Sequence, residues 1–136
     1  MTNREKIDYL KQYKNLDKYI NHLIEDAERL RTRAEKFTPT LTGLPQGGDG
    51  ENQRELAICK LVDLNNEIDE KIDLYVDLGR EIRGNIDSVP DVILRTILLL
   101  KYIEGLTWEQ IAVDLQYSWR NVHYLHSRAL KEFNII

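Results

Sequence analysis

The stretch "WEQIAVDLQYSWRNVHYLH", Trp108 to His126, decides how the C-terminal part of the chain folds. Thr107, followed three residues later by Gln110, forms a capping-box pair that begins a short helix, "WEQIAVDL". Ser118 can cap a second helix, "WRNVHYLHSRALKEF", and only a two-residue linker lies between the helices. Two helices joined so closely must cross steeply, so the spacing predicts a helix-turn-helix.

The turn carries Gln116 at the position where motifs of this kind usually place glycine. Its neighbours fit the turn, because Ala112 is small where the helices approach and Val122 is β-branched where it must fill the angle between them. We therefore expect Gln116 to have a positive φ angle, or the turn to open slightly to avoid one.

The last helix divides into two faces when its residues are placed 100° apart. The inner face is expected to form a core with Ile111, Leu115 and the preceding helix, which spans Asp91 to Glu104 and ends at Gly105. The predicted inner residues of the last helix are Val122, Leu125, His126, Ala129 and Phe133.

The outer face of the last helix is the candidate functional surface. It presents Arg120, Tyr124, Ser127 and Lys131, with Asn121 and His123 on its flanks. In DNA-reading motifs of this geometry, the N-terminal turn of the second helix reaches the base edges. Arginine can bind guanine, asparagine can bind adenine, and aromatic rings can contact thymine methyl groups. The predicted DNA-contacting residues are Ser118, Trp119, Arg120, Asn121, His123, Tyr124 and Ser127.

Three of the residues in and beside this surface have structural alternatives. Trp119 can equally cover the hydrophobic core. His126 faces inward and is expected to be packed. His123 and His126 together suggest a metal site, but no further ligand lies near them in the sequence, so we expect no metal and no cofactor.

Two long helices are expected upstream. From Lys6 to Phe37 apolar residues recur in steps of four and three, as in a heptad seam. A second helix is expected from about Asn52 to Gly84. The two seams need an antiparallel hairpin or a dimer to cover them. Their members are Tyr9, Tyr13, Leu16, Ile20, Leu23, Ala27, Leu30, Ala34 and Phe37, then Ala57, Leu61, Leu64, Ile68, Ile72, Tyr75, Leu78 and Ile82.

A Gly/Pro-rich connection over residues 38–50 is expected between these helices, and it lacks the Gly-Lys-Ser/Thr of a phosphate-binding loop. The segment "SVPD" predicts the start of a new helix, with Ser88 as its N-cap and Pro90 in its first turn. The predicted domains are a helical hairpin for dimerisation or partner binding over residues 1–88 and a helix-turn-helix over residues 89–136.

Composition narrows the class of protein. Hydrophobic residues make up 42% of the chain and charged residues 31%, which fits a helical protein of one or two small units. The single cysteine, Cys59, excludes an internal disulfide and a cysteine-based zinc site, and we expect it to be buried. The start of the chain has no apolar signal core and no run of about 18 apolar residues occurs, so we expect a cytoplasmic protein without a membrane segment.

The net charge of −4 is unevenly distributed. Residues 37–90 hold five Lys/Arg and eleven Asp/Glu, whereas residues 91–136 hold five of each. The acidic residues of the second helix are expected to form a solvated face rather than a catalytic or metal site. Since phosphate neutralisation supplies much of the affinity for DNA, one copy should bind weakly, and a homodimer would compensate by avidity.

The segment "LLLKYIEGLTWEQIAVDLQYSWRNVHYLHSRALKEF" resembles region 4 of sigma-70-type transcription factors. The shared features are the helix before "YIEGLT", the "EQIA…L" helix, the serine cap, the valine and the closing "RAL". The resemblance implies that Trp119, Arg120, His123 and Tyr124 occupy positions that touch promoter DNA. The sequence departs from that pattern at Gln116 and in the small number of basic residues, and residues 1–88 do not resemble the sigma domain that opens promoters.

The whole chain, with "FTPTLTGLPQGG" between two long helices, is similar to a family of small phage and prophage proteins of Gram-positive bacteria that are grouped with late-transcription regulators. We therefore expect an all-α, sequence-specific DNA-binding regulator of the bacterial host cytoplasm, acting as a homodimer. Two alternatives stay open: a protein-interaction module that acts on RNA polymerase or another regulator, and a DNA-packaging component like a small terminase subunit. Catalytic activity is not expected, because the sequence shows no nucleophile–base pair, metal cluster or phosphate loop.

Overall fold

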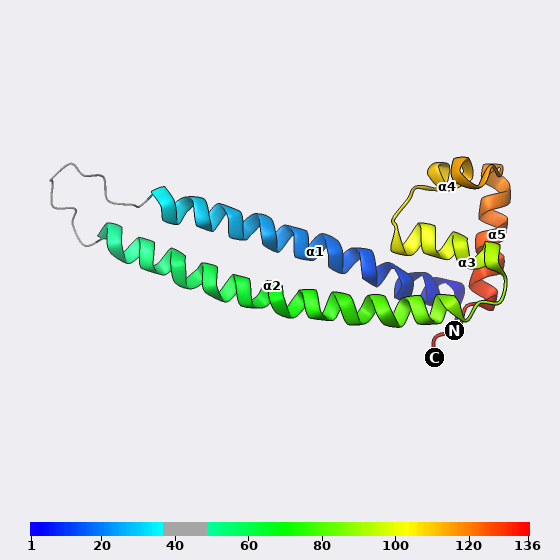
Figure 1. The fold of residues 1–136 in the computed structure, drawn as a ribbon, viewed down its shortest axis with the longest axis horizontal. Helices are drawn as coiled ribbons and strands as arrows, with labels where there is room; N and C mark the ends of the chain where they lie inside the picture. The colour runs from blue at the N-terminus through cyan, green and yellow to red at the C-terminus, as the bar shows by residue number, and fades with distance from the viewer. Residues whose placement is uncertain (37–48) are drawn as a thin grey trace. The chain divides into compact units, whose positions relative to one another are not determined.

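The computed structural model describes residues 1–36 and 49–136, and all regular structure in this part of the chain is helical, which confirms the all-α prediction. Most of the predicted connection, residues 38–48, lies outside the described residues. Its last two residues, 49 and 50, begin the second helix. The elements, shown in Figure 1, are α1 (Asn3–Lys36), α2 (Asp49–Asp87), α3 (Val92–Leu98), the π-helix η1 (Leu99–Ile103), α4 (Trp108–Leu115) and α5 (Trp119–Glu132).

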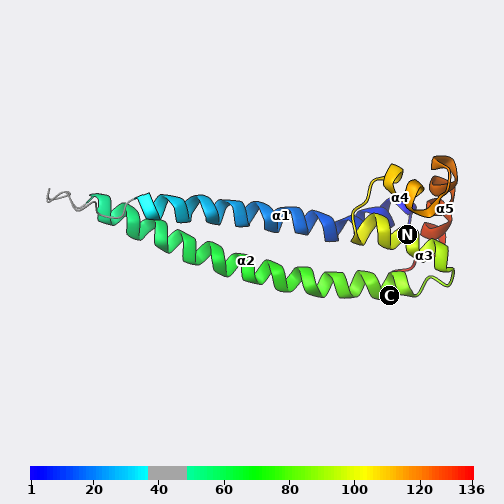
Figure 2. The ribbon, with the colours of Figure 1, turned by 45° about the horizontal axis from the view of Figure 1, so that its top comes forward.

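The helices form two compact units. The hairpin unit comprises residues 18–73, and the helix-turn-helix unit comprises residues 1–17 together with 74–136. In both units α1 and α2 run antiparallel, so the predicted long helical hairpin is present within one chain (Figures 1 and 2). The division into separate domains at residue 88 stays a prediction, although the compact unit that contains α3 to α5 also takes in both ends of the hairpin helices.

The core of the hairpin unit comes from the predicted seams. Leu23, Ala27 and Ile68 are buried, and Leu61 and Leu64 pack against them. Two expectations for α2 were wrong. Ile72 is exposed, because each step of four residues from Leu64 to Ile68 and on to Ile72 rotates about 40° further around the helix and so leaves the buried stripe. Cys59 is exposed, because it lies about 200° around the helix from buried Ala57.

The core of the helix-turn-helix unit joins both ends of the hairpin to α3, η1 and α5. Leu10 of α1, which the predicted seam passed over in favour of Tyr9, is fully buried there. Lys6 is also buried, and its Nζ atom donates a 2.7 Å hydrogen bond to the carbonyl oxygen of Leu130 near the end of α5. The buried members are Leu10, Tyr13, Ile82, Ile86, Val89, Leu94, Leu98, Tyr102, Ile103, Ala129, Leu130 and Phe133.

α1 and α2 approach closely at Gly79. An added Cβ atom there would lie 2.6 Å from the ring of Tyr13, which is itself stacked on Tyr75 with 4.3 Å between ring centroids. The absence of a side chain at Gly79 therefore permits this contact. α2 continues through Gly84, the expected end of the helix, to Asp87.

The start of α3 corrects a further expectation from the sequence. Asp91, not Ser88, is the N-cap: its carboxylate accepts hydrogen bonds from the backbone N–H groups of Ile93 (2.8 Å) and Leu94 (3.2 Å). The hydroxyl of Ser88 instead donates to the carbonyl oxygen of Asn85, at 2.6 Å, at the end of α2. The expected single helix before Gly105 is α3 followed by η1, and Gly105 ends it with a φ of 75°.

None of the helices in the described part of the chain combines the length and the hydropathy needed to cross a membrane.

Candidate nucleic-acid interface

α4 and α5 form the predicted helix-turn-helix and cross steeply (Figures 1 and 2). α4 begins with the expected capping box: the Thr107 hydroxyl accepts from the Gln110 N–H at 3.2 Å, and the Gln110 side chain accepts from the Thr107 N–H at 2.9 Å. Ile111 and Val122 are fully buried, as the core prediction required. Leu115 and Leu125 are half-buried, so they border this core rather than fill it.

The turn between the helices has the strained geometry that the sequence predicted. Gln116 has φ 58° and ψ 38°, in the left-handed region, and it is the only non-glycine residue with a positive φ among those described. Its N–H bonds to the carbonyl oxygen of Val113 at 3.2 Å, and the next N–H, from Tyr117, bonds to that of Ala112 at 3.0 Å. These bonds satisfy the last carbonyl groups of α4 and hold Gln116 in place.

Replacing Gln116 with glycine is expected to stabilise the protein by up to about 1 kcal/mol, because glycine adopts a positive φ without steric cost. Gln116 is exposed, so the substitution removes no core contact. Thermal unfolding followed by circular dichroism measures the effect. Gln116→Ala is the control, since alanine keeps the Cβ atom, and an equal or lower melting temperature for the glycine variant would contradict the strain argument.

Ser118 begins α5 and is the first predicted contact residue. It has extended backbone angles, and its Oγ atom accepts a hydrogen bond from the Asn121 N–H at 3.1 Å. The residue is exposed, so its hydroxyl proton remains available to an outside acceptor such as a phosphate oxygen. Asn121 is half-buried at the first turn of the helix.

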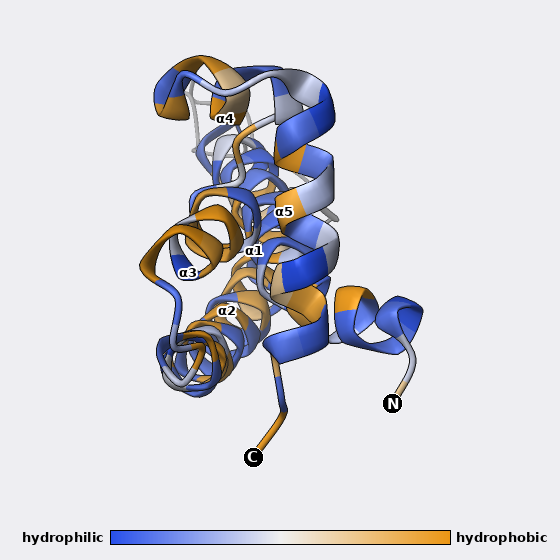
Figure 3. Cartoon of the chain, turned by 90° about the vertical axis from the view of Figure 1, so that its right-hand side faces the viewer, coloured by the Kyte–Doolittle hydropathy of each residue, from blue (hydrophilic) through white to orange (hydrophobic). Residues whose placement is uncertain are grey.

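The outer face of α5 is exposed as predicted. Trp119 is 58% exposed and Tyr124 is 60% exposed, so the alternative in which Trp119 covers the core is wrong. Arg120 and Ser127 are exposed as well, and no described residue forms an ion pair or hydrogen bond with the Arg120 guanidinium. Figure 3 shows the alternation of polar and apolar segments along α5. The first turn of α5 thus offers a cation that pairs with none of the described residues, beside an exposed indole ring.

His123 has a different position from the other predicted contact residues. It is half-buried between two indole rings, with its ring centroid 4.0 Å from that of Trp119 and 4.6 Å from that of Trp108. Its Nε2 atom is buried and has no hydrogen-bond partner among the described residues. His123 therefore supports the exposed ring of Trp119 in this conformation and does not present its Nε2 atom to the surface.

His126 is buried, as predicted, with its Nε2 atom 2.7 Å from the hydroxyl of Tyr102 on η1. Burial, together with the smaller effects of the neighbouring His123 and Lys101, lowers the pKa of His126 to about 4. The imidazole is therefore neutral near pH 7. Burial also raises the pKa of Tyr102 above its ordinary value, so its hydroxyl stays protonated, and the tautomer of the imidazole decides which of the two groups donates the hydrogen bond. Among the described residues, no three His, Cys, Asp or Glu side chains are placed to hold a metal ion.

The stability of the protein is expected to fall as the pH drops from about 6.5 toward 4. In this window the unfolded chain protonates His126 while the folded chain keeps it neutral, so acid favours unfolding. Its contribution to the free energy of unfolding, about 3 kcal/mol, is complete above pH 6.5 and is lost as the pH falls through the folded pKa. Urea titrations at several pH values measure it. His126→Phe should flatten this dependence, whereas His22→Gln, at an exposed histidine, should leave it unchanged; a steep slope in His126→Phe would contradict the assignment.

Two cations near this surface were not predicted as site residues. The Arg128 guanidinium lies over the ring of Tyr124, with 5.9 Å from Cζ to the ring centroid, and Lys101 Nζ lies 4.6 Å from the centroid of Trp108. The contact between Tyr124 and Arg128 could have been predicted from the sequence, because residues four positions apart are neighbours on a helix. Nothing in the sequence points to Lys101, because its contact crosses from η1 to α4.

Residues 92–133 match the family described as Sigma-70, region 4. Neither the curated proteins nor the solved structures include a significant match to the chain. The C-terminal helices are therefore a sigma-70 region 4-like helix-turn-helix domain, as the sequence resemblance implied.

Proposed function

We propose that the protein is a phage-type, sequence-specific DNA-binding transcriptional regulator of Gram-positive bacterial hosts, which works in the host cytoplasm as a homodimer and catalyses no reaction. The observation that carries the proposal is the exposed first turn of α5 on a sigma-70 region 4-like scaffold, where Arg120 follows the exposed Trp119 and pairs with no residue in the described ranges. In this class of motif the corresponding helix enters the major groove with its N-terminal residues against the base edges.

The residues divide into two roles in this proposal. Arg120 and Asn121 are the base readers, since they carry the side chains that bind guanine and adenine, and Trp119 and Tyr124 contact thymine methyl groups or the sugar edge. Ser118 contacts a phosphate through its free hydroxyl proton. Ser127 lies further along the same exposed face. His123 acts indirectly, by supporting the ring of Trp119.

Selection of bound duplexes from a random pool, followed by salt titration, tests the function. A duplex should be enriched, and its affinity should fall linearly with the logarithm of salt concentration, with a slope of about −0.9 for each phosphate neutralised. A scrambled duplex of the same length is the control. The absence of any enriched duplex, together with no retention of DNA at low salt, would overturn the proposal.

A second candidate is a protein-interaction module that docks on RNA polymerase or another regulator. The observation that favours it is the electrostatic neutrality of residues 91–136, which hold five basic and five acidic residues and so attract phosphate weakly. Co-purification of polymerase without DNA binding would support this candidate. A third, a small terminase-like packaging component, requires a ring assembly, which a solution mass measurement would detect.

A further inference from the structure

The hairpin unit has an apolar stripe on α2 that its own core does not use. Ile58, Val62 and Ile72 are 42%, 52% and 40% exposed. At 100° per residue they cluster on one side of the helix, about 50–140° around from the buried stripe of Ala57, Leu64 and Ile68. This separate stripe accounts for the exposure of Ile72, which lies on it rather than on the buried seam.

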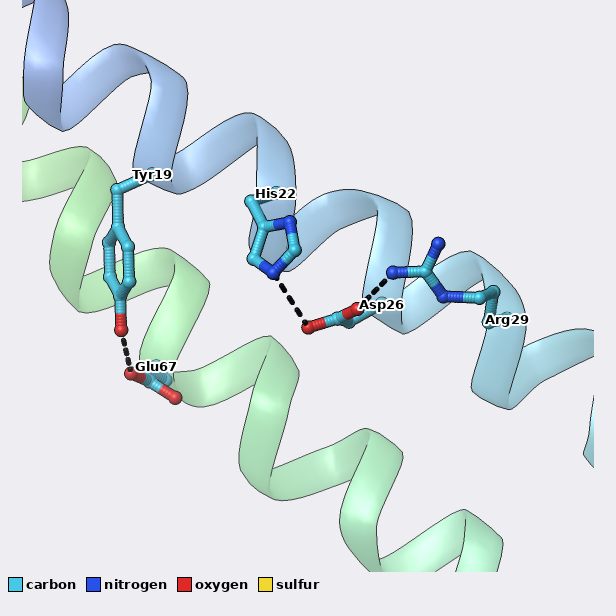
Figure 4. A network of polar contacts seen from close by, with 5 residues as sticks. All are labelled: Tyr19, His22, Asp26, Arg29 and Glu67. Carbon is cyan, nitrogen blue, oxygen red and sulfur yellow. Dashed lines mark hydrogen bonds and ion pairs between the residues drawn. The ribbon is translucent and has the colours of Figure 1, made fainter.

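The polar contacts of the unit mark its opposite face. The Tyr19 hydroxyl donates to the Glu67 carboxylate at 3.2 Å, and His22, Asp26 and Arg29 continue the polar surface along α1 (Figure 4). Because the two helices are antiparallel, residues rotated in the same sense from the buried stripes share one face of the hairpin. On α1, Ile24 lies on the opposite side of the buried stripe from Tyr19, and on α2, Ile72 lies on the opposite side from Glu67. Ile24, which is 40% exposed, therefore belongs to the same apolar face as Ile72.

Two polar residues interrupt the apolar face at its centre. Val62, Asn65, Asp69 and Ile72 follow one another in steps of three, four and three, which is the spacing of a heptad seam. Of the other acidic residues nearby, Asp63, Glu67 and Glu70 fall at other angles around α2, whereas Glu55 and Asp73 lie at the edge of the face, beside Val62. A second helix that covers the face must therefore give Asp69, the carboxylate at its centre, a hydrogen-bond donor.

We propose that this face binds a second copy of the chain, with the two α2 helices antiparallel across it. The order of the four residues is self-complementary: Val62 faces the partner's Ile72, and Asn65 faces the partner's Asp69. The amide of Asn65 donates to that carboxylate, so each polar side chain has a partner when it is buried. A parallel pairing would place the two Asp69 carboxylates side by side, which like-charge repulsion disfavours. Such an isologous contact forms a closed dimer.

This inference specifies the homodimer of the proposed function and rests on it for its biological purpose. The solution mass of the full chain, measured without DNA, tests it directly. Wild type should have about twice the chain mass of 16.0 kDa, and Val62→Lys should be a monomer. Leu56→Lys is the matched control, because Leu56 is 56% exposed on a different side of α2, and this variant should remain a dimer. A monomeric wild type, or equal effects of the two variants, would overturn the proposal.

An exchange of the central polar pair tests the register. Asn65→Asp should weaken the dimer, because two carboxylates then face each other, and Asn65→Asp combined with Asp69→Asn should restore it, because the exchanged pair again matches. Failure of the double variant to recover the dimer would contradict the pairing of residues 65 and 69.

Disulfide trapping tests the direction of the helices. In a Cys59→Ser background, Val62→Cys with Ile72→Cys should form a cross-linked dimer on mild oxidation, whereas Val62→Cys alone should not. A bond within one chain is excluded, because ten residues of helix separate the two positions by about 15 Å. Cross-linking of the single variant would indicate a parallel dimer and overturn the antiparallel arrangement.

The outcomes separate this interface from the DNA-binding function. A dimeric wild type that enriches no duplex would leave the interface standing and remove the proposed function. A monomeric wild type that binds a selected duplex would overturn the interface and leave the DNA-binding function standing.

Discussion

Leu10→Ala is expected to lower the free energy of unfolding of the helix-turn-helix unit by about 2–5 kcal/mol, the range for truncating a buried leucine. Leu10 is fully buried among residues of α2, α3, η1 and α5. The substitution removes apolar contacts and leaves a cavity that the rigid helices around it cannot fill. Since small domains are stable by only about 5–15 kcal/mol, the loss is a large fraction of the total and should lower the temperature at which binding to a selected duplex is lost.

Urea unfolding followed by circular dichroism measures this effect. Leu56→Ala is the control, because Leu56 is 56% exposed and surface substitutions usually change stability by less than about 0.5 kcal/mol. Equal stability of the Leu10 and Leu56 variants would contradict the assignment of Leu10 to the core. The prediction also separates two views of the fold, because a helix-turn-helix that folded independently over residues 89–136 would not respond to residue 10.

The local elements of the C-terminal region were predictable because each depends on neighbouring residues. The capping box at Thr107, the cap at Ser118 and the left-handed Gln116 are all determined within one turn of the chain. The same local reasoning placed the cap of α3 at Ser88, where it was wrong, because Asp91 competes for the role and Ser88 bonds to the end of α2 instead. Two adequate capping residues three positions apart cannot be ranked without the path of the chain.

The contacts between distant parts of the chain were beyond the sequence pattern. Helical periodicity cannot distinguish Tyr9 from Leu10, because both fall near the seam. Leu10 is buried in a core cluster whose other members come mostly from residues 82–133. The bond from Lys6 to the end of α5 spans 124 residues, and no local signal marks a lysine that will be buried. The face of α5 followed from periodicity, whereas the burial of His123 Nε2 between Trp108 and Trp119 depended on the angle between α4 and α5.

Arg120→Ala is expected to remove most of the sequence specificity of DNA binding while leaving the fold intact. A well-placed bidentate arginine–guanine pair contributes about 1–3 kcal/mol of discrimination, which corresponds to roughly a 5- to 150-fold change in the ratio of dissociation constants for a selected and a scrambled duplex. In a homodimer both copies lose the contact, so the combined effect is larger. Because Arg120 is exposed and bonds to no described residue, the melting temperature should not change.

Lys131→Ala provides the matched control for charge. Lys131 is an exposed cation in the last turn of the same helix, away from the N-terminal turn that meets base edges. Its loss can weaken binding to both duplexes alike but should preserve their ratio, as expected for a contact to phosphate. If Arg120→Ala instead behaved like Lys131→Ala, with reduced affinity and unchanged specificity, Arg120 would be a phosphate contact and base reading would fall to Asn121 and the aromatic residues. If it bound the selected duplex as wild type does, the first turn of α5 would not be the reading surface.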